Sequence, residues 1–506
     1  MKTESGMSNN PIAILGIPLD NLTMEETIES IFSMIEAYSR DQMPRLVCTV
    51  NTDFVANTLN WGFDHSRHPE LLDILRKADL VTADGMPLVW TSALLGSPLK
   101  GRVTGADLVP ELAGEAALRH KSIYLLGGKG DVAEKAAGTL TKHYPDLIIA
   151  GCDSPFVHIE GEQLIDALDH DLPIVERINA SGADILLVAF GNPKQELWFE
   201  RNRHRLEVPV SIGIGGTFEF ITGSVQRAPS WMQRTGLEWL FRLTQDPKRL
   251  WKRYLVDFLK FGILVWPSIL YYNYKKQEVN LSRDSQKSGD IQYNCIRYDD
   301  KEAFVVHMPG ILNSRSASLL KDILEEKTGK DSPVIVDFTD VMFIDSHGFG
   351  FLLNLYYSCM RIFLVGLNPA AERFFSYNRM SHLFSQWHFH SIEEALRAVR
   401  NETRGSFLSY KVTEDELAST VSFSGELTAR ETAEKDLPDL VWSVNKTRCT
   451  IDLSHITRID SSGIIFILKL YREILKRDCA CSISGISQDI SQMLRITRVE
   501  NLLHTI

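Results

Sequence analysis

Residues 122–133 have the sequence SIYLLGGKGDVA, which contains the unit that decides the fold class. Ser122–Gly127 is a short, continuously apolar run typical of a buried strand, and Asp131–Leu140 has the spacing of a helix. The alternation continues on both sides, with further apolar runs or helical patterns at Leu46–Val50, Leu71–Ala78, Leu147–Ala150, Ile185–Phe190 and Val210–Ile214. Helices that separate short apolar strands predict an α/β domain with a parallel sheet covered on both faces.

The glycine-rich turn between that strand and that helix fits the pattern G-x-G-x-x-[G/A], in which a helix N-terminus meets a phosphate. Three interpretations stay open. The turn forms a nicotinamide site, which needs an acid near Asp153; it is a tight turn without a ligand; or it contacts the phosphate of another ligand through Gly127 and Gly128.

Length and composition exclude several classes of protein. At about 150 residues per domain, 506 residues predict about three domains. A hydrophobic fraction of 44% and a charged fraction of 24% exclude collagen, intrinsic disorder and a polytopic membrane protein. A net charge of −11 argues against a general nucleic-acid binder. Seven scattered cysteines without C-x-x-C predict buried, reduced thiols, and the first twenty residues show no signal-peptide pattern.

One segment carries the opposite charge to the rest of the chain. From Arg227 to Lys276 there are ten Lys/Arg and three Asp/Glu, a local charge of +7. Its most apolar part, Phe261–Asn273, is shorter than the roughly 20 residues that span a bilayer, and Pro267 is expected to interrupt a helix. The segment 231–275 is either a buried helical appendage or, as we favour, a membrane-surface element with basic flanks and aromatic anchors.

The last part of the chain repeats itself. Residues 276–290 are polar and predict a linker. Beyond them, Ile344–Gly348 (IDSHG) matches Ile459–Gly463 (IDSSG), and Val336–Phe338 matches Ile451–Leu453, both with an offset of 115 residues. A constant offset indicates two copies of one small α/β domain, at 291–402 and 406–506, each with the order strand, strand, D-S-x-G, helix, strand, helix.

Polar motifs follow the predicted strands of the amino-terminal domain. Thr49 and Asn51 close one strand, Asp84 lies in an Ala-Asp-Gly turn, Arg102 begins Arg-Val-Thr-Gly, and Gln195 lies in Gly-Asn-Pro-Lys-Gln-Glu. Because ligands bind at the carboxyl ends of strands in an open α/β sheet, we expect these side chains to converge. For each residue alone, turn or capping chemistry is an alternative interpretation.

Together these motifs resemble the WecG/TagA/CpsF glycosyltransferases, glycosyltransferase family 26, over roughly residues 12–264. The resemblance includes GIPLD at 16–20, Arg227-Ala228-Pro229 and LEWLFR at 237–242. It implies a Rossmann-like domain that transfers a sugar, N-acetylmannosamine or another hexose, with inversion from a UDP-sugar to a polyprenyl-diphosphate-linked acceptor at the cytoplasmic face of a bacterial membrane. It also implies an appendage that meets the membrane and completes the site with arginines, without a metal.

Residue chemistry agrees with these roles. An inverting transfer needs a base, and Asp84 matches the family's proposed base. A UDP leaving group needs cationic partners, for which the candidates are Arg102, Arg227, Arg242, Arg249 and Arg253. Thr49, Asn51 and Gln195 are expected to orient sugar or acceptor hydroxyls. Asp169-His170-Asp171 has the D-x-D form of metal-dependent transferases, but it follows a helical pattern; we interpret it as a solvated helix end and expect no metal and no cofactor.

The repeat resembles the STAS domain, twice over. In anti-sigma antagonists of that family the serine after the aspartate is phosphorylated, which implies Ser346 and Ser461 as possible phosphorylation sites. A phosphate there adds about two negative charges at a helix N-terminus. Alternatively, each serine is simply a favoured helix cap. His347 departs from the usual small residue, so Ser461 is the better candidate.

The predicted protein is a UDP-sugar-dependent transferase of polysaccharide or cell-envelope synthesis, peripheral on the inner membrane face, with a core at 1–230 and STAS modules that bind a protein partner. The alternative is a STAS-based regulatory protein with an inactive transferase domain. The presence of Asp84, Arg102 and Gln195 favours the enzyme.

Overall fold

The fold is that of a computed structural model. It describes residues 11–503 apart from 62–65, 282–290, 299–300, 309, 328–331, 358–361, 381–387, 402–407, 416, 434–439, 442–443 and 445. The predicted join between the two repeats and most of the predicted linker therefore lie outside the described residues.

The amino-terminal domain contains the predicted parallel sheet. Six strands run in the order β4-β3-β8-β7-β5-β6, all neighbours parallel. Their bounds are β3 Arg45–Val50, β4 Leu80–Ala83, β5 Ser122–Gly127, β6 Ile148–Asp153, β7 Ile185–Ala189 and β8 Val210–Gly213. Because all six strands are parallel, their carboxyl ends meet at one edge of the sheet, which is where open α/β sheets bind ligands.

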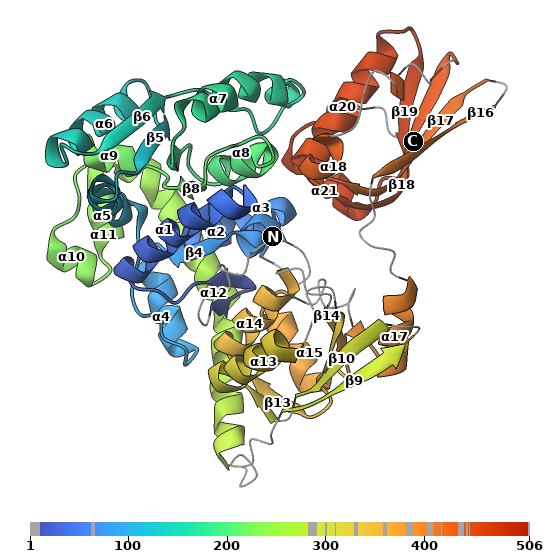
Figure 1. Ribbon diagram of the computed structural model, residues 1–506, viewed down its shortest axis with the longest axis horizontal. Helices are drawn as coiled ribbons and strands as arrows, with labels where there is room; N and C mark the ends of the chain where they lie inside the picture. Colours follow the sequence, from blue (N-terminus) through green and yellow to red (C-terminus); the bar gives the residue numbers. More distant parts are fainter. Residues whose placement is uncertain are drawn as a thin grey trace.

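Helices cover both faces of this sheet, as the apolar strands predict (Figure 1). One core packs α1 (Met24–Asp41), α5 (Gly105–Leu118), α6 (Val132–His143) and α9 (Thr217–Ile221) against it. The other core lies under α3 (Pro69–Lys77), α8 (Lys194–Asn202), parts of α2 (Thr52–Thr58), α4 (Met86–Leu94) and α7 (Ala167–Ser181), and the hairpin of β1 (Ile12–Ile14) and β2 (Ile17–Leu19). Thr23 caps α1, because its side chain accepts from the Glu26 amide while Glu26 accepts from the Thr23 amide.

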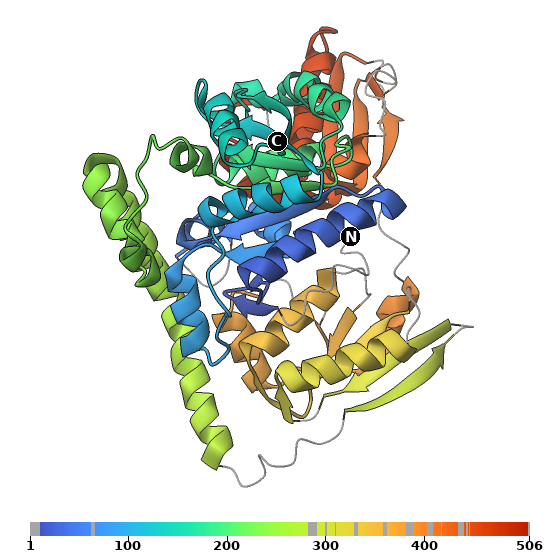
Figure 2. The ribbon, with the colours of Figure 1, turned by 60° about the vertical axis from the view of Figure 1, so that its left-hand side comes forward.

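A long helix follows the sheet domain and leads to the repeats. After α10 (Ser230–Arg234) and α11 (Glu238–Gln245), α12 runs without interruption from Pro247 to Leu281 (Figure 2). The expectation that Pro267 would interrupt a helix is wrong. Leu264, Val265 and Ile269 are buried around it, and this packing offsets the ~3 kcal/mol that a helical proline costs. The helix also extends into the segment predicted as a linker.

By length and composition alone, α12 is the one helix of the described residues that is apolar enough to cross a membrane, within Leu250–Glu278. However, 39% of the most apolar 18-residue stretch of this helix is buried inside the protein.

Both repeats have the predicted small α/β form. The first has a sheet of order β15-β14-β12-β10-β9 and a short pair of β11 and β13; the second has the order β16-β17-β18-β19. In the first repeat the elements are β9 Gln292–Tyr298, β10 Lys301–His307, β11 Gly310–Leu312, α13 Ser314–Lys327, β12 Val334–Asp337, β13 Val341–Ile344, α14 Ser346–Tyr357, β14 Ile362–Val365, α15 Pro369–Tyr377, β15 His388–Phe389 and α17 Ile392–Asn401. In the second they are β16 Ser409–Glu414, β17 Ser419–Leu427, α18 Ala429–Ala433, β18 Arg448–Ile459, α20 Ser461–Leu475, β19 Ala480–Ser484 and α21 Gln488–Ile496.

One strand differs between the copies. β18 is continuous where the first repeat has β12 and β13, but the two copies share one side-chain hydrogen bond at this point. Thr339 donates to Asp337, and Ser454 donates to Asp452.

Each repeat contacts the sheet domain through the helix that begins with its D-S-x-G serine. In the first repeat, α14 packs on β1 and β2, and Gly350 lies so close to the hairpin that a Cβ there would be 2.3 Å from the Pro11 carbonyl oxygen. The second copy has Ile465 at the matching position, and its helix α20 packs on α8 instead. A helical glycine in the first repeat therefore permits close backbone approach.

The cysteine prediction needs one correction. Cys48, Cys449, Cys479 and Cys481 are buried and free, but Cys295 is exposed, because β9 is the edge strand of its sheet, and Cys152 is half-buried. Cys359 lies outside the described residues.

Gly350→Ala should destabilise the contact between the first repeat and the hairpin, because the added methyl overlaps the backbone at Pro11 and overpacking costs about 1–3 kcal/mol. The measurement is the denaturant midpoint of the full chain. Gly138→Ala is the matched control: it also lies in a helix, has no atom within 4 Å of the new Cβ, and should raise stability by up to about 1 kcal/mol. If the two substitutions changed the denaturant midpoint equally, the close approach of Gly350 to the Pro11 backbone would be contradicted.

Candidate active site

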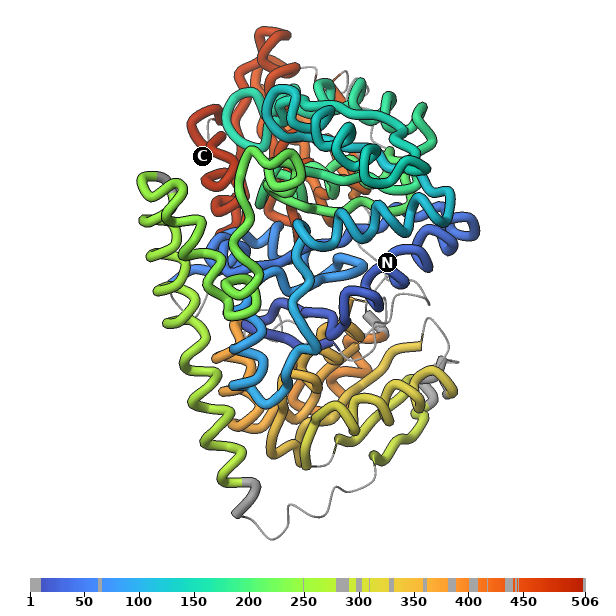
Figure 3. The backbone as a smooth tube through the Cα atoms, turned by 90° about the vertical axis from the view of Figure 1, so that its left-hand side faces the viewer, coloured from blue at the N-terminus to red at the C-terminus, as the bar shows by residue number. Residues whose placement is uncertain are grey.

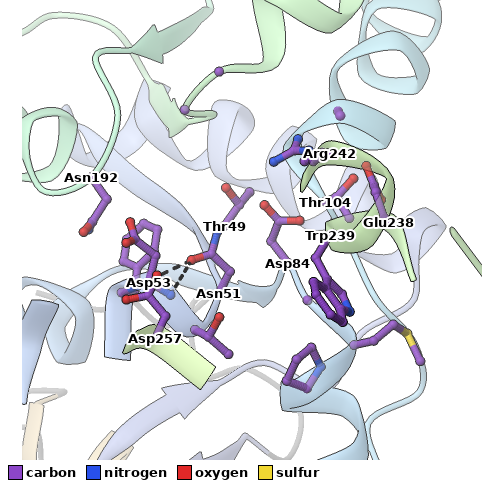
Figure 4. A pocket seen from close by; sticks show the side chains of 18 of the residues that line it. Thr49, Asn51, Asp53, Asp84, Thr104, Asn192, Glu238, Trp239, Arg242 and Asp257 are labelled. Carbon is purple, nitrogen blue, oxygen red and sulfur yellow. Dashed lines mark hydrogen bonds between the residues drawn. The ribbon is translucent and has the colours of Figure 1, made fainter. Parts of the chain in front are cut away.

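A pocket of about 340 Å³ lies at the carboxyl ends of β3, β4, β7 and β8, and side chains of α11 and α12 line its other side (Figure 4). It lies at the predicted edge of the sheet. Side chains from the sheet domain and from the appendage line it together, among them Thr49, Asn51, Asp53, Asp84, Arg102, Thr104, Asn192, Gln195, Glu238, Trp239, Arg242, Arg253, Tyr254, Asp257 and Phe258.

Asp84 follows β4 and lies in the middle of this pocket (Figure 4). Its amide donates to the Val50 carbonyl, which fixes the turn after the strand. Burial is the main cause that raises the pKa of the Asp84 carboxyl, to about 7; the charges of Arg242 and Arg102 oppose this shift, and those of Glu238 and Asp107 add to it. A carboxyl with a pKa near neutrality can take up and release a proton at physiological pH.

An ion-pair cluster joins the appendage to the sheet domain beside Asp84. Arg102 Nη1 lies 2.9 Å from Glu238 Oε2 on α11, and Arg227 Nη1 lies 2.7 Å from Asp107 Oδ1. The cluster closes through a 3.6 Å contact of Arg102 with Asp107. Arg102 thus lines the pocket as predicted, whereas Arg227 lies behind it and holds α11 in place.

The appendage arginines are placed differently from one another. Arg242 lines the pocket, its guanidinium lies 4.4 Å above the Phe220 ring, and its buried Nε has no hydrogen-bond partner among the described residues. Arg253 lines the opposite end, beside Asp53 and Asp257. The side chain of Arg249 lies outside the described residues.

Three predicted polar residues reach the pocket but are already engaged. Thr49 Oγ1 donates to the Gly213 carbonyl at 2.8 Å, and Asn51 Oδ1 caps α2 by accepting from the Asp53 amide at 3.0 Å. Gln195 is buried, and its Oε1 accepts from the amides of Gly191 and Gly215 at 3.2 and 3.1 Å. Gln195 therefore positions two loops, rather than presenting its amide to a substrate.

Two predicted motifs lie elsewhere. Gly127 and Gly128 both adopt positive φ in a tight strand–helix turn but are not among the pocket's lining residues. The interpretation of Asp169-His170-Asp171 as a solvated helix end is wrong for Asp171, which is buried and forms an ion pair with Arg201 at 2.7 Å. A buried carboxylate requires a cationic partner, and for Asp171 this partner is Arg201 on α8.

Asp53, Asp257 and Glu238 line the pocket but were not predicted as site residues, and neither was Glu196, which is buried beside it. Asp53 on α2 and Asp257 on α12 lie side by side (Figure 4), and burial raises the pKa of both carboxyls, that of Asp257 to about 6. Burial likewise raises the pKa of Glu196 to about 7. Glu196 lies in the Gly-Asn-Pro-Lys-Gln-Glu motif, so the sequence offered a signal for it. Asp257 could not be predicted, because no pattern in the sequence shows that α12 packs over α2.

The two D-S-x-G serines lie outside this pocket. Ser346 and Ser461 are both buried where α14 and α20 begin. Asp345 and Asp460 cap these helices by accepting from the amides of Gly348 and Gly463.

Comparisons with known proteins agree with this division of the chain. Residues 12–274 match the model of the glycosyl transferase WecG/TagA/CpsF family, residues 296–395 match the STAS domain, and residues 411–504 match a STAS domain of the Mlab type.

Among curated proteins, an N-acetylglucosaminyldiphosphoundecaprenol N-acetyl-beta-D-mannosaminyltransferase of Bacillus subtilis is 32% identical over 46% of this chain and 84% of its own length. The protein of that name from Staphylococcus aureus is 30% identical over 49% of this chain and 91% of its own length. Among solved structures, the unphosphorylated anti-sigma factor antagonist SpoIIAA aligns with 19% of this chain and 88% of its own, at 13% identity and a TM-score of 0.17.

Replacement of Asp84 by Asn should change how stability depends on pH. The folded-state pKa of about 7 lies above the ordinary value of 3.8, so the folded protein binds more protons between about pH 4 and 7, and wild-type stability falls as pH rises through that window. Asp84→Asn removes this loss. The denaturant midpoint of the variant should therefore rise relative to that of the wild type between pH 4 and 7, and the difference between the two should stay constant above pH 7.

Asp131→Asn is the control for that experiment. Asp131 is exposed and its pKa is lowered by the Lys135 ammonium, so its effect should not change across the same window. A midpoint difference for Asp84→Asn that stays flat from pH 4 to 7 would contradict the raised pKa.

Proposed function

This chain belongs to the WecG/TagA/CpsF glycosyltransferase family and carries two STAS domains, and from that membership we propose that it transfers a hexose from a UDP-sugar to a polyprenyl-diphosphate-linked acceptor. N-acetylmannosamine and a lipid-linked N-acetylglucosamine are the first donor sugar and acceptor to test, because the names of both relatives state that pair.

The observation that carries the proposal is Asp84, a carboxyl of pKa about 7 inside a pocket that Arg242 also lines. The buried Nε of Arg242 has no hydrogen-bond partner among the described residues. In an inverting transfer, one side chain takes the proton of the acceptor hydroxyl as that oxygen attacks the anomeric carbon. A carboxylate with a pKa near neutrality accepts that proton more readily than an ordinary aspartate and is still ionised in a large fraction of molecules.

Charge builds on the departing diphosphate as the glycosidic bond to it breaks. Arg242 suits this charge, because its stacking on Phe220 fixes the guanidinium plane and its Nε has no partner among the described residues. Arg253 at the other end of the pocket is a second cation. Arg102 already has two carboxylate partners, so in this proposal it acts chiefly by holding α11 and tuning Asp84.

The acceptor's lipid requires the site to lie at a membrane, and α12 lies along the outside of the molecule (Figure 3). Its inner face is fixed to the protein: Lys260 Nζ donates to the Ala56 carbonyl at 2.6 Å, and Asp257 is buried. Its outer face carries an exposed stripe of large apolar side chains three or four residues apart, namely Trp251, Leu255, Leu259, Ile263, Trp266, Leu270 and Tyr274.

A helix with one face packed on protein and the other apolar and exposed is suited to lie in the membrane interface rather than to cross it. To span the bilayer, α12 would have to expose the buried Lys260 and Asp257 to lipid, which is costly. We therefore propose a peripheral enzyme on the inner membrane face, in polysaccharide or cell-envelope synthesis.

The function is tested by release of UDP from a panel of UDP-hexoses in the presence of a lipid-linked N-acetylglucosamine diphosphate. Transfer that depends on the acceptor supports the proposal. If the folded protein transfers none of the sugars, the alternative of a regulatory protein with an inactive transferase domain takes its place.

Asp84→Asn should lower turnover about 10²- to 10⁴-fold, because the amide has nearly the same shape but cannot take up the proton. Binding of UDP-sugar should change much less. The measurement is turnover at saturating acceptor beside the dissociation constant of the donor. Near-normal turnover would show that Asp84 is not the base.

Leu259→Glu combined with Ile263→Glu should abolish sedimentation with vesicles that contain anionic lipid, because both side chains lie more than half exposed on the stripe. Turnover on a soluble acceptor analogue should be retained. Leu118→Glu, at an apolar residue that is 76% exposed on α5, is the control and should still sediment. Full vesicle binding by the double variant would contradict this role for the stripe.

A further inference from the structure

Helix α4 has the polarity of an ordinary surface helix reversed. Its sequence, MPLVWTSAL, contains no charged residue. Thr91 and Ser92 are buried, whereas Trp90 and Leu94 are 44% and 54% exposed, and Ala93 beside them is exposed as well. A helix of a soluble domain normally turns its large apolar side chains inward, and an outer face that is apolar is typical of a surface that binds an apolar partner.

Packing fixes this orientation of α4. On the buried side, Ser92 Oγ donates to the Val89 carbonyl at 2.7 Å and accepts from the Leu99 amide at 2.9 Å. At the far end, the Tyr272 hydroxyl of α12 lies against Gly96, where a Cβ would overlap it. A rotation of α4 that buried its apolar side chains would break these contacts, so the apolar face stays outward.

The apolar face of α4 begins inside the active-site pocket. Asp84 and Met86 both line the pocket, so the helix starts there and leads away from it. Met86, Trp90 and Leu94 are spaced by four residues and therefore follow one face of the helix over about 12 Å. These three residues are called the α4 track.

The α4 track leaves the pocket beside one turn and then runs along α12. Gly236, in the turn between α10 and α11, also lines the pocket, and a Cβ there would be 2.6 Å from the Trp90 ring and 2.8 Å from Met86 Cβ. Beyond this turn, α4 lies next to α12 on the outside of the molecule (Figure 3). The track thus connects the pocket with the side of the molecule on which α12 lies.

We propose that the α4 track binds the first isoprene units of the polyprenyl chain that carries the acceptor. This inference rests on the proposed function, in which the acceptor is lipid-linked. The acceptor hydroxyl has to reach Asp84, while a pocket of about 340 Å³ holds a ligand of ordinary small-molecule size and not a polyprenyl chain. The chain therefore leaves the pocket, and the α4 track is an apolar path that starts where the chain has to start.

A single chain explains the inner end of the track, which a bilayer surface does not. Met86 is only partly exposed, lines the pocket and lies against Gly236, so a flat membrane surface does not reach it. A chain held in the pocket by its diphosphate passes Met86 and then meets the Trp90 ring, which offers a large apolar surface with few rotatable bonds. The stripe on α12 is thus left to the bilayer, and the α4 track to the acceptor chain.

The track is tested first without any transfer reaction. A polyprenyl-diphosphate N-acetylglucosamine with a photoreactive diazirine on its second isoprene unit is irradiated with the full chain in detergent micelles, and the labelled peptides are identified by mass spectrometry. Label is expected within residues 86–95. Leu94→Glu should lower this label at least about fivefold, because a carboxylate replaces apolar surface that the chain covers.

Leu118→Glu is the matched control for the labelling. Leu118 is the last residue of α5, as Leu94 is of α4, and it is also exposed. This variant should be labelled like the wild type. Label confined to α12 would overturn the proposal, and so would a Leu94→Glu variant that is labelled as strongly as the wild type. If that equally labelled variant also sedimented less with vesicles, α4 would meet the bilayer instead of the acceptor chain.

The second test compares two acceptor chain lengths in the transfer reaction. Leu94→Glu should raise the KM for a long-chain acceptor in micelles at least about fivefold, and should not raise the KM for an analogue with one isoprene unit, which is too short to reach Leu94. Leu259→Glu with Ile263→Glu, on the α12 stripe, should change neither KM in micelles, where no bilayer has to be bound.

Two outcomes of the transfer test separate the track from the proposed function. Equal changes of both KM values in Leu94→Glu would indicate a structural defect and would overturn the role of the track, while the proposed function would stand. If the wild type uses neither acceptor, the proposed function fails, and the labelling of residues 86–95 still decides whether the chain binds there.

Discussion

The burial of one face of α12 against the transferase domain is the contact on which the rest of the molecule depends. From that face Arg253, Tyr254, Asp257 and Phe258 enter the pocket, and Lys260 fixes the helix to α2. Farther along, Tyr271 donates to the Ala370 carbonyl and Ser268 to the Tyr377 carbonyl, so the same helix holds the first STAS domain. The stripe that faces outward is left exposed only because these contacts occupy the other side. The lining of the pocket, the placement of the first STAS domain and the exposure of the apolar stripe proposed to meet a membrane are thus consequences of a single helix orientation.

Pocket chemistry follows from this arrangement more than from any single residue. Asp84 on an open sheet edge would be an ordinary carboxylate. Its raised pKa requires α11 to cover it, and α11 is held there by Glu238 pairing with Arg102. Charges of both signs surround Asp84, so small movements of α11 alter the balance between Arg242, which favours ionisation, and Glu238, which opposes it. In the proposed function, the protonation state of Asp84 is thereby linked to the position of α11.

The sequence predicts the local parts of this structure well and the long-range parts poorly. The strands of the sheet, the duplication at an offset of 115 residues and the convergence of Asn51, Asp84 and Arg102 follow from periodicity and from the rule that ligands bind at strand ends. The continuity of α12 through Pro267 depends on tertiary packing, which a helix-breaking rule ignores. The buried pair of Asp171 with Arg201 and the two neighbouring carboxyls of Asp53 and Asp257 join segments far apart in the chain, and no spacing in the sequence indicates them.

The two STAS domains show how one duplicated unit can serve two docking sites. At matched positions, Gly350 lets α14 lie directly on the backbone of the β1 hairpin, whereas Ile465 keeps α20 at side-chain distance, where ion pairs form the contact. Close backbone packing depends on shape and is insensitive to charge, whereas a contact made by exposed ion pairs weakens as the salt concentration rises. Duplication followed by this one divergence gives a chain with one domain fixed by α12 and the hairpin and one whose attachment depends on ionic strength.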